Sequence, residues 1–111
     1  MGTCVPFVCK GTLGFPGGTS PSVGSTPSFV TAADLNGDGK PDLAVANSDS
    51  NTVSVLLNQG NGSFAAQVTY AVGADSFSVA AADLNGDGKP DLAVANQGSN
   101  NVSVLLNTCL P

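Results

Sequence analysis

Short runs in which apolar and polar residues alternate fill the middle of the chain. Four such runs, rich in Val and other strand-forming residues, cover about residues 29–33, 42–47, 52–58 and 66–72. No window shows the apolar stripe with a period of 3.6 residues that an amphipathic helix requires. The pattern therefore predicts an all-β fold built from short strands, with turns between them.

Both faces of the predicted sheet carry apolar side chains. In the third run, Val53 and Val55 share one face and Leu56 lies on the other, because successive residues of a strand point to opposite sides. The second run offers the small residues Ala44 and Ala46, which suit a crowded inner strand. We therefore expect each sheet to pack against a neighbour rather than to face solvent on one side.

The pattern repeats after 49 residues. Residues 43–47 are identical to residues 92–96, and residues 53–58 are identical to residues 102–107. A period near 50 residues is typical of solenoids, propellers and arrays, and four antiparallel strands per period are typical of a propeller blade. We therefore expect an all-β fold with two four-stranded antiparallel blades of the β-propeller type.

The same register divides the chain into three parts. Residues 1–27 would hold a strand over about residues 3–9, at a third-strand position, and a Gly/Pro/Ser-rich arm whose residues 15–24 fall on a fourth-strand position. Residues 28–77 form the first repeat. Residues 78–111 form an incomplete second repeat with strands one to three and a Cys-bearing C-terminal tail. About nine strands would result, which is enough for two blades and one spare strand.

A nine-residue acidic motif, Asp-Leu-Asn-Gly-Asp-Gly-Lys-Pro-Asp, occupies residues 34–42 and again residues 83–91. It places oxygen-bearing side chains at positions 1, 3, 5 and 9, with Gly at positions 4 and 6. Ligands at alternate positions converge on one cation only where the backbone turns sharply, and glycine permits such turns. A hairpin turn alone would explain the glycines but not the repeated oxygens. The motif predicts two Ca²⁺ sites, because this ion prefers six to eight oxygen ligands.

An EF-hand is the helical alternative for such a motif. It requires a bidentate Glu at position 12 and flanking helices. Position 12 is Val45 in the first copy and Val94 in the second, and each lies inside a predicted strand. The loop is therefore expected between the first and second strands of each blade.

The chain resembles the FG-GAP/VCBS repeats, which form Ca²⁺-binding blades in integrin α-type β-propellers, certain fungal lectins and many secreted bacterial proteins. The acidic motif, the period and Gly62-Ser63-Phe64 before a Val-rich strand carry the resemblance, over about residues 28–107. It implies Ca²⁺ ligation by side chains at positions 1, 3, 5 and 9 and by the main-chain carbonyl at position 7. The implied ligands are Asp34, Asn36, Asp38, Lys40 (carbonyl only) and Asp42 in the first loop, and Asp83, Asn85, Asp87, Lys89 (carbonyl only) and Asp91 in the second.

Composition narrows the functional classes. Six of the eight Asp residues lie in the acidic motifs, so the net charge of −5 is mostly local, and two bound Ca²⁺ ions would bring it to −1. Three Lys and no Arg argue against nucleic-acid binding. The chain has no His and no nucleophile motif, which argues against an enzyme. No apolar run approaches the ~18–20 residues of a spanning helix, so membrane insertion is not expected.

The three cysteines, Cys4, Cys9 and Cys109, lie outside the repeats. An odd number predicts one pair and a free thiol, or a bond between chains. If residues 4–9 are extended, Cys4 and Cys9 lie ~16 Å apart, which is too far for a disulfide. Cys109 is then the favoured partner for one of them, within the chain or in a neighbour. The N-terminus lacks the basic region of a signal peptide, so a secreted protein would have lost its leader before this numbering begins.

The favoured functional hypothesis is a non-enzymatic calcium-binding repeat module, extracellular or at the cell surface, that acts as a structural self-assembly unit. Two blades cannot close a ring, so they leave apolar faces and strand edges that invite another chain. Three or four copies would close a ring, whereas contacts that fail to close would give a filament. The N-terminal arm and the terminal cysteines fit strand exchange between copies.

The alternative hypothesis is an adhesion or lectin-like binding module that forms part of a larger β-propeller, with a protein or glycan ligand. A glycan site usually offers exposed aromatic rings, and this chain has no Trp and only one Tyr. The sequence therefore favours the assembly hypothesis over the lectin hypothesis.

Overall fold

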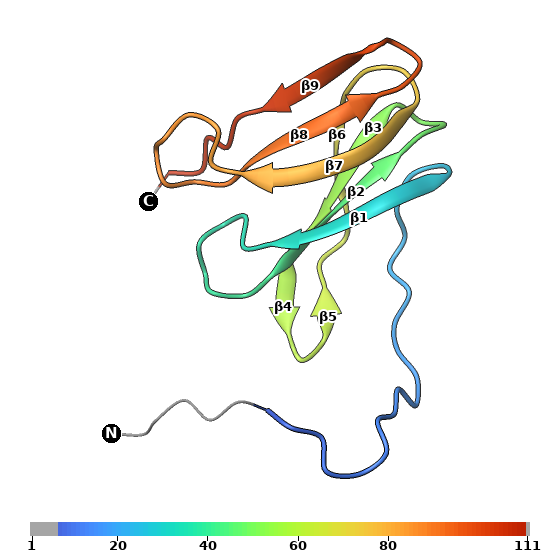
Figure 1. Cartoon of the computed structure of the whole chain (residues 1–111), viewed down its shortest axis with the longest axis vertical. Helices are drawn as coiled ribbons and strands as arrows, with labels where there is room; N and C mark the ends of the chain where they lie inside the picture. Colours follow the sequence, from blue (N-terminus) through green and yellow to red (C-terminus); the bar gives the residue numbers. More distant parts are fainter. Residues whose placement is uncertain (1–6, 111) are drawn as a thin grey trace.

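The computed structural model describes residues 7–110 and shows nine strands and no helix within them (Figure 1). The strands are β1 Pro27–Ala33, β2 Asp42–Asn47, β3 Thr52–Leu56, β4 Asn58–Gly60, β5 Ser63–Phe64, β6 Val68–Ala71, β7 Ser76–Ala82, β8 Asp91–Asn96 and β9 Asn101–Leu105. The prediction of an all-β, antiparallel fold is confirmed. No helix within the described residues could span a membrane.

The strands β1, β2, β3 and β6 form the N-terminal sheet, in that order. All neighbours are antiparallel. The predicted strand over residues 52–58 is shorter in the structure and ends at Leu56, because the backbone beyond Leu56 no longer pairs with β2. The N–H of Asn58 donates to the carboxylate of Asp42 instead, and residues 58–60 pair with β5 in a separate two-stranded ribbon.

The strands β7, β8 and β9 form the C-terminal sheet, which has three strands among the described residues. These are the three strands predicted for the incomplete second repeat, whereas a second four-stranded blade is not confirmed. Residues 15–24, which fall on a fourth-strand position, form no strand and pair with none of the described strands, although residues 19–21 border β5. The strand predicted over residues 3–9 lies mostly outside the described residues, and residues 7–9 are not in a strand.

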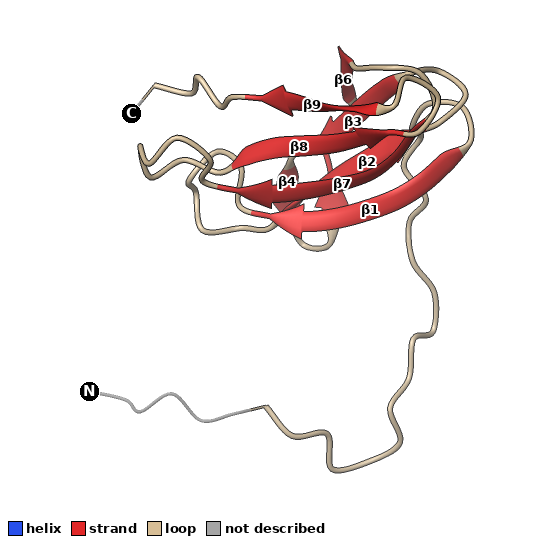
Figure 2. Cartoon of the chain, turned by 45° about the horizontal axis from the view of Figure 1, so that its top comes forward, coloured by secondary structure: helices blue, strands red, loops and turns tan. Residues whose placement is uncertain are grey.

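The two sheets pack face to face, and the core lies between them. The strand β7 lies against β1 and β2 (Figures 1 and 2). Small residues of β2 let the sheets approach closely, as the sequence predicts for Ala44 and Ala46, which are 1% and 0% exposed. The buried core consists of Ala44, Ala46 and Val53 from the N-terminal sheet and Val79, Leu92 and Val94 from the C-terminal sheet.

Residues 7–24 form an irregular arm that runs away from the sheets (Figure 1). Phe7 and Phe15, in this arm, are 87% and 86% exposed. Cys9 and Cys109 are both free and exposed, so these two do not pair within the chain, and Cys4 lies outside the described residues. Hydrogen bonds join the chain to the N-terminal sheet just after the arm, at Ser25 and Thr26, and residues 19–21 border β5.

Candidate metal centres

Each acidic motif forms the loop between the first two strands of a sheet. Residues 34–41 join β1 to β2, and residues 83–90 join β7 to β8. Both loops lie at the same end of the molecule (Figures 1 and 2). Position 9 of each motif is already the first residue of the following strand, so the sheet itself fixes that side chain.

Three carboxylates converge in each loop. One oxygen each of Asp34, Asp38 and Asp42 lies within 4.8 Å of the other two, and Asp83, Asp87 and Asp91 form an equivalent group. Like charges at this separation repel one another, and a cation between them removes the repulsion. Such a cluster could hold a metal ion.

The carboxylate at position 1 organises the backbone of the loop. In the first loop, Asp34 accepts hydrogen bonds from the N–H groups of Gly37 (2.8 Å), Asp38 (3.2 Å) and Gly39 (2.8 Å). The two glycines adopt left-handed φ angles of 77° and 85°, which lets these N–H groups point to one side chain. The hydrogen bond from Gly39, ahead of those from Gly37 and Asp38, lowers the pKa of Asp34.

The second loop repeats this arrangement bond for bond. Asp83 accepts from Gly86 at 2.8 Å, from Asp87 at 3.2 Å and from Gly88 at 2.8 Å. The hydrogen bond from Gly88 is the main cause that lowers the pKa of Asp83. The carboxylate at position 1 is therefore ionised in both loops at neutral pH.

The carboxylate at position 9 fastens the loop to the sheet. Asp42 is 0% exposed, and its two oxygens accept from Leu35 N and Asn58 N, both at 2.8 Å. Asp91 accepts from Leu84 N at 2.8 Å and from Asn107 N at 2.7 Å. A carboxylate oxygen that accepts one hydrogen bond keeps a second lone pair. Position 9 can therefore serve as clamp and ligand together.

The amide at position 3 provides a test of whether the loop fits a cation. The side-chain amide of Asn85 lies beside the Oδ1 atoms of Asp83 and Asp87, and its N–H₂ group, turned toward them, donates to them at 3.2 and 2.9 Å. The same amide offers its oxygen to a cation when it turns the other way. Because every side chain of this group can supply an oxygen ligand, the residues fit a hard divalent cation.

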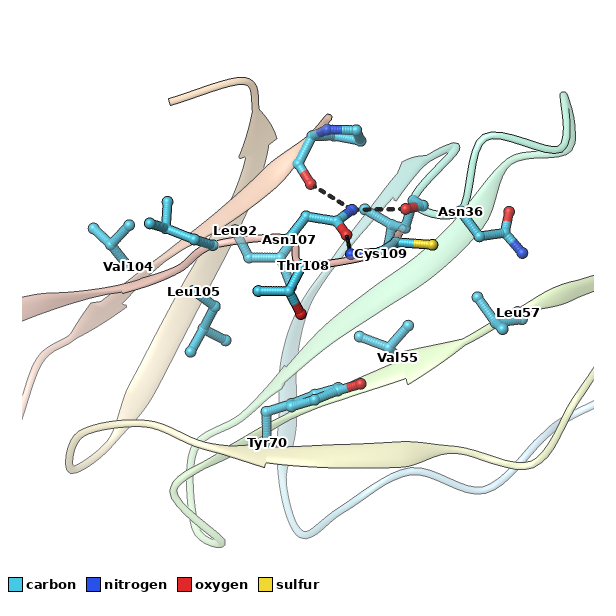
Figure 3. A pocket seen from close by; sticks show the side chains of 13 residues that line it. Asn36, Val55, Leu57, Tyr70, Leu92, Val104, Leu105, Asn107, Thr108 and Cys109 are labelled. Atoms are coloured by element: carbon cyan, nitrogen blue, oxygen red, sulfur yellow. Dashed lines mark hydrogen bonds between the residues drawn. The ribbon is translucent and has the colours of Figure 1, made fainter. Parts of the chain in front are cut away.

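The remaining predicted ligands belong to the same loops. Lys40 and Lys89 each donate their N–H to the position 5 carboxylate at 3.0 Å, so the backbone of position 7 lies beside the cluster. Asn36 is exposed and borders a hollow between the two sheets (Figure 3). Both motifs thus assemble their carboxylates.

Two asparagines that the motifs do not include position the loops. The side-chain amide of Asn58 donates to Pro41 O at 2.8 Å. Asn107, its counterpart, donates to Pro90 O at 3.0 Å and also to Leu35 O at 2.7 Å, which lies in the first loop. Asn107 therefore links the first acidic loop to the C-terminal sheet. The sequence does mark both asparagines, because each is the last residue of a segment that is identical in the two repeats.

The fold and the loops define a class: a β-repeat protein in which an acidic loop joins the first two strands of each repeat. The model of the FG-GAP-like repeat family matches residues 34–94, more than half of the chain. The chain belongs to the FG-GAP-like repeat family, and its sheets correspond to blade modules of a propeller. Comparison with curated proteins and with solved structures gave no match.

Proposed function

We propose that this chain is a non-enzymatic, extracellular, calcium-binding repeat module that acts as a structural self-assembly unit. The observation that carries the proposal is the pair of three-carboxylate clusters, each built by the same backbone hydrogen bonds. They stand beside sheets that leave apolar surface exposed on their outer sides.

Calcium is the cation that the donor set favours. The clusters offer carboxylate, amide and carbonyl oxygens and no nitrogen or sulfur, and Ca²⁺ accepts six to eight such ligands in a flexible arrangement. Asp34, Asn36, Asp38, Lys40 through its carbonyl, and Asp42 would hold one ion, and Asp83, Asn85, Asp87, Lys89 through its carbonyl, and Asp91 the other. A bound ion would neutralise the mutual repulsion of the carboxylates and so hold each loop in one conformation.

An extracellular location agrees with this cation. FG-GAP repeats are typical of extracellular proteins, and Ca²⁺ there is abundant enough to fill sites with dissociation constants in the range of 10⁻⁴–10⁻³ M. A structural role follows from the placement of the ligands, because the position 9 carboxylates are buried and bonded to the sheet.

Self-assembly is supported by the open surfaces of the C-terminal sheet. Val102 and Val104 on β9 are 61% and 54% exposed, and β9 has a partner strand on one side only among the described residues. An apolar face next to an unpaired strand edge is a surface that other chains cover. Three or four copies would complete a ring, and contacts that do not close would extend into a filament.

One observation favours the alternative, an adhesion or lectin-like module of a larger propeller. A hollow of about 520 Å³ lies between β3, β6 and β9 and includes Tyr70 in its wall (Figure 3). A protein or glycan ligand would then occupy it.

The molar mass in solution tests the proposed function. Light scattering after size exclusion, in 2 mM Ca²⁺ (about twentyfold above a dissociation constant of 10⁻⁴ M), should give three or four chains or a filament. EDTA should return the sample to smaller species. A monomer in Ca²⁺ contradicts self-assembly, and a monomer that binds immobilised glycans would support the alternative.

A further inference from the structure

The contact between the two sheets joins two different faces. We call them face A and face B. Face A of the N-terminal sheet consists of Ala44, Ala46, Val53 and Val55. Face B of the C-terminal sheet consists of Val79, Leu92, Val94 and Leu105. The members of each face point to the same side of their sheet, because each one is paired across two strands with another member of the same face.

The repeat gives each sheet a copy of both faces. Face A of the C-terminal sheet, 49 residues on, consists of Ala93, Ala95, Val102 and Val104. Face B of the N-terminal sheet, 49 residues earlier, consists of Val30, Leu43, Val45 and Leu56. Each residue of these two faces is identical to its counterpart 49 positions away. The molecule therefore carries a second copy of each half of its own internal contact, although Val45 and Leu56 of the second face B are 7% and 1% exposed and so buried within the chain.

Exposure shows which copies lack a partner. Val53 is 0% exposed inside the contact, whereas its counterpart Val102 is 61% exposed. Val79 is 2% exposed, whereas its counterpart Val30 is 55% exposed. The central residues of the outer face B are already covered, so its open part is the strip along β1. The outer face A is open along the whole of β9.

The link that enters β1 has the geometry of the link between the two sheets. Residues 72–75 connect β6 to β7, and residues 23–26 precede β1 by the same register. Ser48 N donates to Thr26 O at 2.9 Å, and Gln97 N donates to Asp75 O at the same distance. Thr26 and Asp75 have φ angles of 54° and 55°. The chain thus enters the N-terminal sheet as it would after a fourth strand.

The hollow between the sheets lies beside the unpaired edge of β9. Its walls include Val55 and Tyr70 from β3 and β6, and Leu105 from β9 (Figure 3). Val68 and Tyr70 are 53% and 47% exposed although they lie on the side of the N-terminal sheet that faces the C-terminal sheet. A fourth strand along β9 would cover them.

We propose that copies of this chain associate head to tail by repeating the internal contact. The open strip of face B along β1 of one copy, which includes Val30, packs on face A of the preceding copy's C-terminal sheet. The arm of the first copy adds residues 19–22 to β9 of the preceding copy as its fourth strand. This inference rests on the proposed self-assembly function and supplies its surfaces. The proposed contact is heterologous, because it joins two different faces, so each added copy presents the same open faces again.

The register of the added strand follows from the N-terminal sheet. Thr69 of β6 is opposite Ser54 of β3, so Ser20 of one copy is opposite Ser103 of the other. Pro21 takes the position of Tyr70, whose N–H faces β3, so the added strand makes one ladder bond fewer than β6 does. The bond from Asn107 to Leu35 O has its intermolecular counterpart in Asn58 and Leu84 O.

A charge on the open face A tests the contact. We expect Val102→Lys to convert the Ca²⁺-dependent assembly to single chains, because the lysine ammonium would be buried against the next copy. Leu110→Lys, which changes an 83% exposed side chain outside both faces, should leave the molar mass unchanged. If wild type assembles and Val102→Lys assembles equally well, the inference is overturned while self-assembly stands. If wild type is a monomer in Ca²⁺, both fail.

Cross-linking tests the strand register without relying on a disruptive variant. In a background without the native cysteines, chains with Ser103→Cys are mixed in Ca²⁺ with chains with Ser20→Cys and oxidised. The inference predicts disulfide-linked pairs on a non-reducing gel. The matched control replaces Ser20→Cys by Thr12→Cys, eight residues out of register, and should give at least tenfold less product. Equal yields from the two mixtures, or none from either, would overturn the register.

Discussion

At the scale of single residues, each acidic loop divides its carboxylates between two roles. The position 5 carboxylates of Asp38 and Asp87 are exposed and accept one backbone hydrogen bond each. The position 9 carboxylates are buried and hold two N–H groups each. Because a buried donor without an acceptor is costly, the position 9 residue should matter to the fold even when no cation is present.

The variants Asp42→Ala and Asp38→Ala separate these roles. In EDTA, Asp42→Ala should lower the free energy of unfolding by about 2–4 kcal/mol, because it leaves Leu35 N and Asn58 N without their acceptor. Asp38→Ala should change it by less than about 0.5 kcal/mol, as expected for an exposed site. Urea denaturation measures both. Equal losses would show that position 9 is not the structural clamp.

At the scale of elements, the alternation of apolar residues predicted β1, β2, β6 and the strands of the second repeat from local information. The end of β3 at Leu56 could not be predicted, because it depends on a hydrogen bond from Asn58 N to a carboxylate 16 residues away. Only the 49-residue register predicts a strand position for residues 15–24 of the arm. A strand needs the backbone hydrogen bonds of a neighbouring edge, and within residues 7–110 residues 15–24 pair with no strand.

The entry into β1 gives a prediction at this scale. A Cβ at Gly24 would lie 2.8 Å from the side-chain Cγ of Asn47, so Gly24→Ala should cost about 1–3 kcal/mol of stability. Gly73→Ala, which meets Asn96 at 2.7 Å, should cost a similar amount. Gly14→Ala has no atom within 4 Å and should be neutral. Thermal unfolding followed by circular dichroism measures the three, and a neutral Gly24→Ala would mean that the entry is not packed as described.

At the scale of the whole molecule, the repeated sequence predicts two like sheets, and the position of the acidic motifs predicts two like loops. The carboxylates of each loop do converge, because the glycines and the position 1 carboxylate act within a few residues. The 49-residue register also predicts the three strands of the second sheet, whereas the bridge from Asn107 to the first loop depends on how the sheets meet. Such relations between distant segments are not contained in local periodicity.

Metal removal should therefore lower the stability of the whole chain. At a hundredfold excess of Ca²⁺ over its dissociation constant, each site contributes about 2.7 kcal/mol. For a domain of this size, each kcal/mol shifts the melting temperature by roughly 4–8 °C. Melting in Ca²⁺ should occur well above melting in EDTA, and Mg²⁺ at the same concentration should restore less of the difference. Coincident curves in Ca²⁺ and EDTA would contradict a structural role for the cation.

The number of Ca²⁺ ions that one chain binds tests the two cation sites most directly. Calorimetric titration of the EDTA-treated and dialysed chain with CaCl₂ should give two Ca²⁺ ions per chain. Asp38→Asn and Asp87→Asn should each retain one site, because each variant removes a carboxylate from a single loop. A wild-type chain that binds no Ca²⁺, or a single ion that both variants leave in place, would contradict the assignment of the two loops as calcium sites.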